Sequence, residues 1–304
     1  MREITISDER AGPYGITAGP DGALWLTLTH SGHVARVDAG GDVTTVDAGG
    51  PAAQPALITA GPDGALWFTC TRDDHIGRVT AGGAVTRFAL PAGCGPYGIT
   101  AGPDGALWFT QMNADRIGRI SPDGVITDFP LPVSGGFASA ITAGPDGALW
   151  FTLNQANAVG RITVDGDVRL HALPTAGAAP VGIAADGEAV WFVEIGAGQV
   201  GRIMPDGHVT EVALPDRAAR PHAVVAAGRG DLWFTEWGAN RVGRLRAGSA
   251  NGDRAGAASG DIAGAAIAEY DLPTAASEPH GLTVAADGAV WVALEIGRLV
   301  RLEP

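Results

Sequence analysis

Apolar and polar residues follow a pattern that repeats along nearly the whole chain. The clearest copy, residues 95–110, reads GPYGITAGPDGALWFT: a short apolar segment, the turn PDG and a second apolar segment. Two short apolar segments joined by a tight turn with Pro and Gly predict a β-hairpin. The second segment of each copy carries one tryptophan, and these are Trp25, Trp67, Trp108, Trp150, Trp191, Trp233 and Trp291.

Successive tryptophans lie 41 or 42 residues apart, except for the last interval of 58 residues, which indicates an insertion. A full unit predicts four strands, as in GITAG, ALWFT, RIGRI and ITDFPLP between Tyr97 and Pro132. A period of about 40–45 residues with four short strands is typical of a β-propeller. We therefore expect an all-β, seven-bladed β-propeller with four antiparallel strands per blade, formed by residues 1–304 as a single domain.

Two segments depart from the repeat. Residues 3–6 (EITI) predict a strand without a hairpin partner, while the seventh repeat ends without its fourth strand. We expect the N-terminal strand to complete that last blade.

Residues 246–267 are rich in Gly, Ala and Ser and stand where other repeats have a short turn between their third and fourth strands. This composition predicts a flexible insertion within blade six, with helix compatible only with the alanine cluster near its end.

Composition narrows the classes of function. The formal net charge of −13 argues against nucleic-acid and anionic-membrane partners, since both require a basic surface. All 20 basic residues are arginine, which excludes Schiff-base lysine chemistry and a Walker-type phosphate loop. No apolar run has membrane-spanning length and the first residues lack the apolar core of a signal peptide, so we expect a cytoplasmic protein. We also expect a monomer. Cys70 and Cys94 are expected to be free thiols.

The repeats differ at a position that a propeller brings to one rim, where the first strand of each blade begins and the second ends. In the motif P-x-G-I, the variable residue is Tyr14, Ala56, Tyr97, Ser139, Val181, His222 or His280 in chain order. Two histidines and two tyrosines in a slot that other blades fill with Ala, Ser or Val predict a polar site at the central channel. The alternative is an exposed slot that is free to vary. We favour the site, because histidine is the usual proton-transfer residue near neutral pH.

Carboxylates occur at the same rim. Glu278 precedes His280 by two residues, and Glu295 follows the exit of the adjacent strand in the same blade. Two carboxylates can hold Mg²⁺, which keeps much of its hydration. Glu194 and Glu236 occupy the strand exits of blades five and six, one position earlier, and are expected either to form a negative rim or to be solvated.

Aromatic and histidine residues outside the slot carry weaker signals. Trp237, the one tryptophan outside the repeat register, lies on the same rim, where an exposed ring could stack on a substrate or cap the blade edge. The other five histidines are expected at the surface: His30, His33, His75, His171 and His208.

These motifs resemble those of the streptogramin B lyases, also called virginiamycin B lyases, a family of seven-bladed propellers. The likeness covers essentially the whole chain and is most specific in RPHA at 220–223 and EPHG at 278–281. It implies that His280 is the catalytic residue and that Glu278 and Glu295 hold the metal, expected to be Mg²⁺. It also implies that His222 contacts the substrate and that Tyr14 corresponds to a tyrosine near the site.

The implied activity is that of a carbon–oxygen lyase. Such an enzyme linearises cyclic depsipeptide antibiotics of the streptogramin B type by metal-assisted β-elimination at the ester bond, which confers resistance. Two alternatives stay open. A metal-dependent lactonase or esterase on a similar propeller normally shows a fuller set of Asp, Asn and Glu ligands around the channel. A non-catalytic ligand-binding propeller leaves the coincidence of Glu278, His280 and Glu295 in one blade unexplained.

Overall fold

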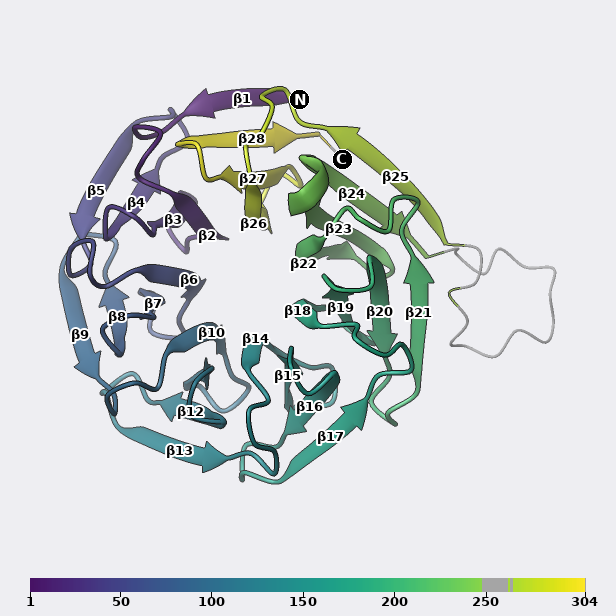
Figure 1. The fold of residues 1–304 in the computed structure, drawn as a ribbon. Helices are drawn as coiled ribbons and strands as arrows, with labels where there is room; N and C mark the ends of the chain where they lie inside the picture. The colour runs from purple at the N-terminus through teal and green to yellow at the C-terminus, as the bar shows by residue number, and fades with distance from the viewer. Residues whose placement is uncertain (248–261, 263–264, 304) are drawn as a thin grey trace.

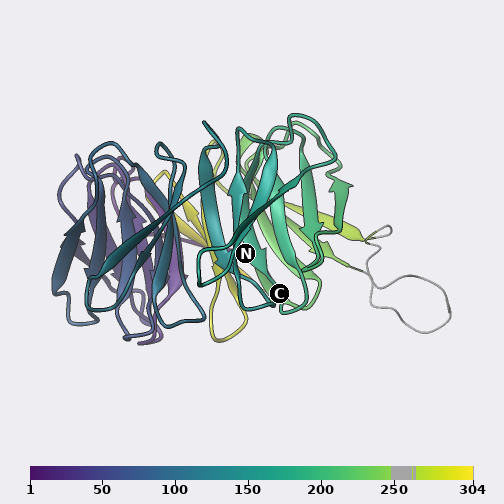
Figure 2. The same ribbon diagram turned by 90° about the horizontal axis from the view of Figure 1, so that it is seen from below.

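The computed structural model describes residues 1–247, 262 and 265–303. In these residues the strands form seven four-stranded antiparallel sheets, which are arranged as blades around a common axis (Figure 1). Seen from the side, the blades form a flat ring with the connecting turns gathered at two opposite rims (Figure 2). The expected all-β, seven-bladed propeller is confirmed. No helix in the described residues is long and apolar enough to cross a membrane.

The first strand of each blade lies innermost and the fourth outermost (Figure 1). Blade one consists of β2 (Pro13–Ala18), β3 (Leu24–Leu28), β4 (His33–Val37) and β5 (Val43–Asp47). Blade two consists of β6 (Pro55–Ala60), β7 (Leu66–Cys70), β8 (His75–Val79) and β9 (Val85–Ala89). Blade three consists of β10 (Pro96–Ala101), β11 (Leu107–Gln111), β12 (Arg116–Ile120) and β13 (Ile126–Pro130). Blade four consists of β14 (Ala138–Ala143), β15 (Leu149–Leu153), β16 (Ala158–Ile162) and β17 (Val168–Ala172).

The remaining blades follow the same order. Blade five consists of β18 (Pro180–Ala185), β19 (Val190–Glu194), β20 (Gln199–Ile203) and β21 (Val209–Ala213). Blade six consists of β22 (Pro221–Gly228), β23 (Asp231–Glu236), β24 (Arg241–Arg246) and β25 (Ala266–Asp271), with the short 3₁₀-helix η1 (Trp237–Ala239) after β23. Blade seven consists of β26 (Pro279–Val284), β27 (Val290–Leu294), β28 (Arg298–Leu302) and β1 (Arg2–Thr5).

The repeated tryptophans fill the spaces between blades. Trp108 of blade three is fully buried and packs against Ile141 and Phe151 of blade four. Asp104 of the PDG turn accepts hydrogen bonds from Trp108 Nε1 at 3.0 Å and from Arg119 Nε at 2.6 Å. The turn therefore fixes the indole while the indole fixes the next blade. The same pair of hydrogen bonds to one aspartate recurs in blades one, two and four. Blade five keeps the bond from the tryptophan, and blades six and seven keep a bond from the arginine.

The two ends of the chain complete blade seven together. β1 pairs with β28 over four residues, from Arg2 opposite Arg301 to Thr5 opposite Arg298. Glu3 also accepts a hydrogen bond from Arg298 Nη1 at 3.2 Å. The expected closure by the N-terminal strand is confirmed. β1 thus covers the edge of β28 and becomes the short outer strand of blade seven.

The segment 246–267 is partly built into blade six. β24 extends to Arg246 and β25 begins at Ala266, so both ends of the expected insertion belong to strands. Ile262 is 4% exposed and packs in the cluster that contains Trp191 and Leu245. The expected flexibility concerns residues 248–261, 263 and 264, which lie outside the described residues.

Candidate functional site

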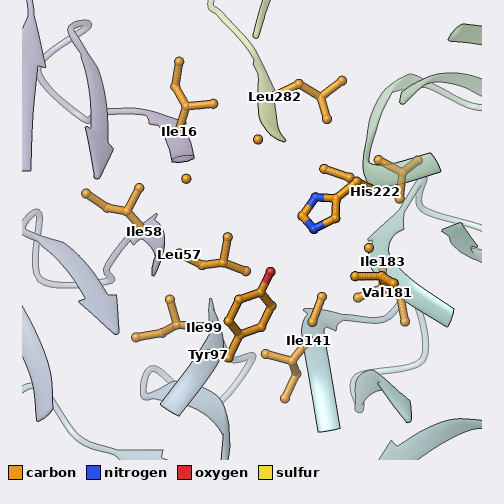
Figure 3. A pocket seen from close by; sticks show the side chains of 16 residues that line it. Ile16, Leu57, Ile58, Tyr97, Ile99, Ile141, Val181, Ile183, His222 and Leu282 are labelled. Atoms are coloured by element: carbon orange, nitrogen blue, oxygen red, sulfur yellow. The ribbon is translucent and has the colours of Figure 1, made fainter. Parts of the chain in front are cut away.

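Each blade enters its innermost strand through the same backbone geometry. The residue before this strand has a positive φ in every blade, at Gly12, Gln54, Gly95, Phe137, Ala179, Arg220 and Glu278. Each inner hairpin then shifts register within its first four residues, which is a β-bulge. The bulge carries the variable slot residue. Figure 3 shows Tyr97 and His222 pointing from their strands toward the middle of the ring.

Four slot residues from four different blades meet at the mouth of the channel. The hydroxyls of Tyr14 and Tyr97 lie 2.7 Å apart, and the Tyr14 hydroxyl lies 3.4 Å from His222 Nε2. The ring of His280 lies 4.3 Å from that of Tyr14 and 5.0 Å from that of His222, between centroids. The polar slot residues therefore form one cluster.

An apolar cavity of about 190 Å³ adjoins this cluster. Tyr97 and His222 line it together with a ring of aliphatic residues from the inner strands, visible in Figure 3. The labelled aliphatic residues are Ile16, Leu57, Ile58, Ile99, Ile141, Val181, Ile183 and Leu282. The side chains of the inner strands thus change from polar in the cluster to mainly aliphatic around the adjoining cavity.

A carboxylate group lies beside the cluster. His280 Nε2 lies 2.6 Å from Glu295 Oε2, and one ligand atom each from Glu278, His280 and Glu295 fall within 4.8 Å of one another. The backbone N–H of Glu295 donates to the carbonyl of Glu278 at 3.3 Å, which holds the two glutamates side by side. Blade seven therefore brings together the three residues expected to carry the chemistry.

Burial and hydrogen bonding set the charges in the site. Burial lowers the pKa of His222 to about 3, so its imidazole is neutral near pH 7. The hydrogen bond with Glu295 raises the pKa of Glu278, whereas the hydrogen bond with His280 lowers the pKa of Glu295. His280 Nδ1 is buried without a hydrogen-bond partner in the described residues. The nitrogen of His280 that faces the carboxylates is therefore Nε2.

His30 is exposed, as expected of a surface histidine, and it also contacts a residue of the carboxylate group. Its Nε2 lies 3.0 Å from Glu295 Oε1, although about half of its side chain is exposed. His30 follows β3 of blade one by two residues, and closure of the ring makes blade one the neighbour of blade seven. The sequence already predicted that closure makes blades one and seven neighbours, so His30 could have been considered for the site on that ground.

Trp237 begins the short helix η1 that follows β23 in blade six. It occupies the position that Glu295 has in blade seven, because its backbone N–H donates to the carbonyl of Arg220 at 3.2 Å, just as Glu295 donates to Glu278. The Arg220 guanidinium lies 5.8 Å from the centre of the indole. The ring is half-buried, and its Nε1 is enclosed without a hydrogen-bond partner in the described residues. Trp237 is thus an aromatic residue at the strand exit of blade six, the blade that also carries His222.

The expectation for Glu194 and Glu236 is wrong, because both side chains are fully buried. Each is the last paired residue of its strand, and its side chain points into the blade. Glu295 stands one residue further along the chain. Because successive side chains of a strand point to opposite sides, this one-residue difference changes which side the carboxylate faces. Glu194 Oε2 accepts from Gln199 Nε2 at 2.7 Å, and Glu236 Oε2 lies 3.1 Å from Arg241 Nε. Burial raises the pKa of both glutamates to about 7. They form neither a negative rim nor a solvated edge.

Comparison with known proteins identifies the family of this chain. The profile of the virginiamycin B lyase family matches residues 1–302. A virginiamycin B lyase of Saccharopolyspora erythraea is 62% identical over 45 residues, a stretch that spans 15% of this chain and 15% of that relative. The solved structure of a selenomethionine-substituted virginiamycin B lyase from Staphylococcus aureus is 40% identical, with a TM-score of 0.88 and coverage of 99% of this chain and 97% of that chain.

A second solved structure shows a catalytically inactive histidine-to-alanine variant of virginiamycin B lyase from Staphylococcus aureus with quinupristin. It is 40% identical and has a TM-score of 0.87, with coverage of 98% of this chain and 97% of that chain. Because the family profile extends over almost every residue and the fold agrees with both solved relatives, this chain belongs to the virginiamycin B lyase family.

Proposed function

We propose that this protein is a carbon–oxygen lyase that opens the ring of cyclic depsipeptides of the streptogramin B type by β-elimination at the ester bond, and so confers resistance to them. The observation that carries the proposal is the meeting of His280, Glu278 and Glu295 at the channel mouth. The relative with quinupristin supports the substrate class, since it is 40% identical over nearly the whole chain.

A β-elimination needs a base and a means of holding developing negative charge. The proton α to a carbonyl moves to the base, the electrons of that C–H bond form the new C=C bond, and the ester oxygen departs with the C–O electrons as a carboxylate. We assign the base to His280, because histidine is the usual proton-transfer residue near neutral pH and this ring lies in the cluster beside the carboxylates. Glu295, 2.6 Å from His280 Nε2, would stabilise the imidazolium that results.

Neutral polar groups beside the base suit an uncharged ester substrate. His222 stays neutral at physiological pH, and Tyr14 keeps its proton because burial raises the pKa of its hydroxyl. Both can therefore offer hydrogen bonds without attracting a counter-ion. We assign His222 and Tyr14 to substrate binding, with Trp237 as an aromatic contact at the edge of the site.

The carboxylates fit a divalent cation. Glu278 and Glu295 are close enough for one to raise the pKa of the other, and a cation would relieve this crowding of like charges. Oxygen ligands with an open side suit Mg²⁺, which retains water in its coordination shell. A bound Mg²⁺ would supply a Lewis acid that stabilises negative charge on the substrate carbonyl oxygen.

The test of this assignment is the variant His280→Ala with quinupristin as substrate. General bases contribute roughly 10²- to 10⁴-fold, so turnover should fall by about that factor while binding of quinupristin stays within a few-fold of wild type. His208→Ala, which changes a histidine in the turn between β20 and β21, serves as the control. Turnover by His280→Ala at the wild-type rate would refute the assignment of the base.

A further inference from the structure

Tyr97 reaches the site from a blade that does not adjoin it. β10, which carries Tyr97, belongs to blade three, while Tyr14 belongs to blade one. The slot of blade two, between them, holds Ala56, whose methyl group is small enough to let the two tyrosine hydroxyls approach to 2.7 Å. Figure 3 shows the ring of Tyr97 extending into the middle of the propeller, with its hydroxyl pointing inward.

This contact is the shorter of the two hydrogen bonds of the Tyr14 hydroxyl. The other one, to His222 Nε2, is 3.4 Å long and therefore weak. A buried hydroxyl needs a partner, because burying a polar group without one costs free energy. Tyr97 is thus the main polar restraint on the end of the Tyr14 side chain.

The ring of Tyr14 in turn packs on His280. The two rings are tilted by 36° with centroids 4.3 Å apart, which is close contact between aromatic faces. A rotation of Tyr14 would therefore change the surface against which the His280 imidazole rests. A continuous path leads from Tyr97 through Tyr14 to the base.

We propose that Tyr97 is a positioning residue: through its hydrogen bond to Tyr14 it fixes the ring that orients His280. The proposal rests on the function proposed above only in taking His280 as the base. Neither tyrosine belongs to the packed clusters between blades in the described part of the chain. The shared hydroxyl contact therefore acts within the channel and is not needed to hold the blades together.

The first test measures geometry without relying on activity. In Tyr97→Phe, the ring-proton NMR resonances of His280, assigned by their loss in His280→Ala, should shift because the ring current of Tyr14 moves. Tyr14→Phe breaks the same hydrogen bond from its other end and should shift the same resonances. Tyr270→Phe removes the same atom from β25 and should leave them in place. Unshifted His280 resonances in a folded Tyr97→Phe variant would overturn the proposal.

The second test measures turnover of quinupristin. Loss of one neutral hydrogen bond predicts a fall in kcat of about fivefold in Tyr97→Phe, with KM within about twofold of wild type. In a Tyr14→Phe background the added Tyr97→Phe change should lower kcat no further, since the bond is already absent. An additive loss would contradict the path through Tyr14. If Tyr97→Phe shifts the His280 resonances but the wild-type protein does not consume quinupristin, the proposed function is refuted and the positioning role is still supported.

Discussion

Burial makes Glu194 sensitive to pH. Its carboxyl group is enclosed in blade five, and burial raises its pKa to about 7, above the ordinary value of about 4.5. The raised pKa means that the folded chain holds a proton that the unfolded chain has already lost between these two values. Glu194 therefore contributes stability below about pH 4.5, and this contribution disappears as the pH rises through 7.

Glu194→Gln should remove this pH dependence, because an amide can still accept from Gln199 and carries no charge. At pH 8 the variant should exceed wild type by about 1–3 kcal/mol in free energy of unfolding, with little difference at pH 4. Denaturant unfolding at several pH values measures the gap. Glu9→Gln, at an exposed position, should show no such trend. A gap that stays constant with pH would count against a buried proton on Glu194.

His30 should matter for metal binding through Glu295. Its Nε2 lies 3.0 Å from Glu295 Oε1, so it orients a carboxylate that we assign to the metal. Removing a partner of a metal ligand typically costs 10- to 100-fold in affinity. We expect His30→Ala to weaken Mg²⁺ binding by roughly tenfold in calorimetry, while His33→Ala leaves it unchanged. Equal affinities in both variants would show that His30 is only a surface neighbour.

Residues of the candidate site could be predicted from the sequence where one repeat could be compared with another. His222 and His280 stood out because other blades carry Val or Ala in the same slot. His30 did not, because its role depends on which blades adjoin after closure. Glu194 was misjudged by one position along a strand, and one position decides between the rim and the blade interior.

At the scale of elements, the strand β1 is the part of the fold that the repeat predicts only indirectly. It has no hairpin partner, yet it pairs with β28 along its whole length. Ile4 and Ile6, in and just after this strand, pack with the core between blades seven and one. Its pairing and its packing both contribute to closing the ring.

Deletion of residues 1–8 should lower the melting temperature markedly, because it exposes the edge of β28 and the apolar residues under β1. Differential scanning calorimetry measures the change. The single change Glu9→Ala, at the exposed position just after the deleted segment, should leave the melting temperature within about 2 °C of wild type, in line with surface substitutions. An unchanged melt after the deletion would mean that the ring closes without β1.

The remaining strands could be predicted because paired apolar segments mark them in every unit, with a PDG turn between the first two strands of blades one to four and a DG turn in blades five and seven. The ends of β24 and β25 were harder. Around Arg246 and Ala266 the sequence becomes rich in Gly and Ala, which carry little strand preference, so these residues were assigned to the insertion. At these residues the pairing of β24 with β25 extends both strands despite the local composition.

At the scale of the whole molecule, closure of the ring assembles the site. Tyr14 lies near the start of the chain and His280 near its end, yet their rings are in contact. A repeat architecture predicts that blades one and seven meet. It does not predict how far a side chain reaches across the channel, which is why the contact between Tyr97 and Tyr14 could be found only from the structure.

Elimination and hydrolysis at this site would give products of different mass. Mass analysis of quinupristin after incubation with the wild-type protein and Mg²⁺ therefore distinguishes the two reactions. We expect a linear product of unchanged mass that carries a new C=C bond, and no product after exhaustive chelation. A product heavier by one water would indicate a lactonase and would refute the elimination, and full activity without metal would refute the role of Mg²⁺.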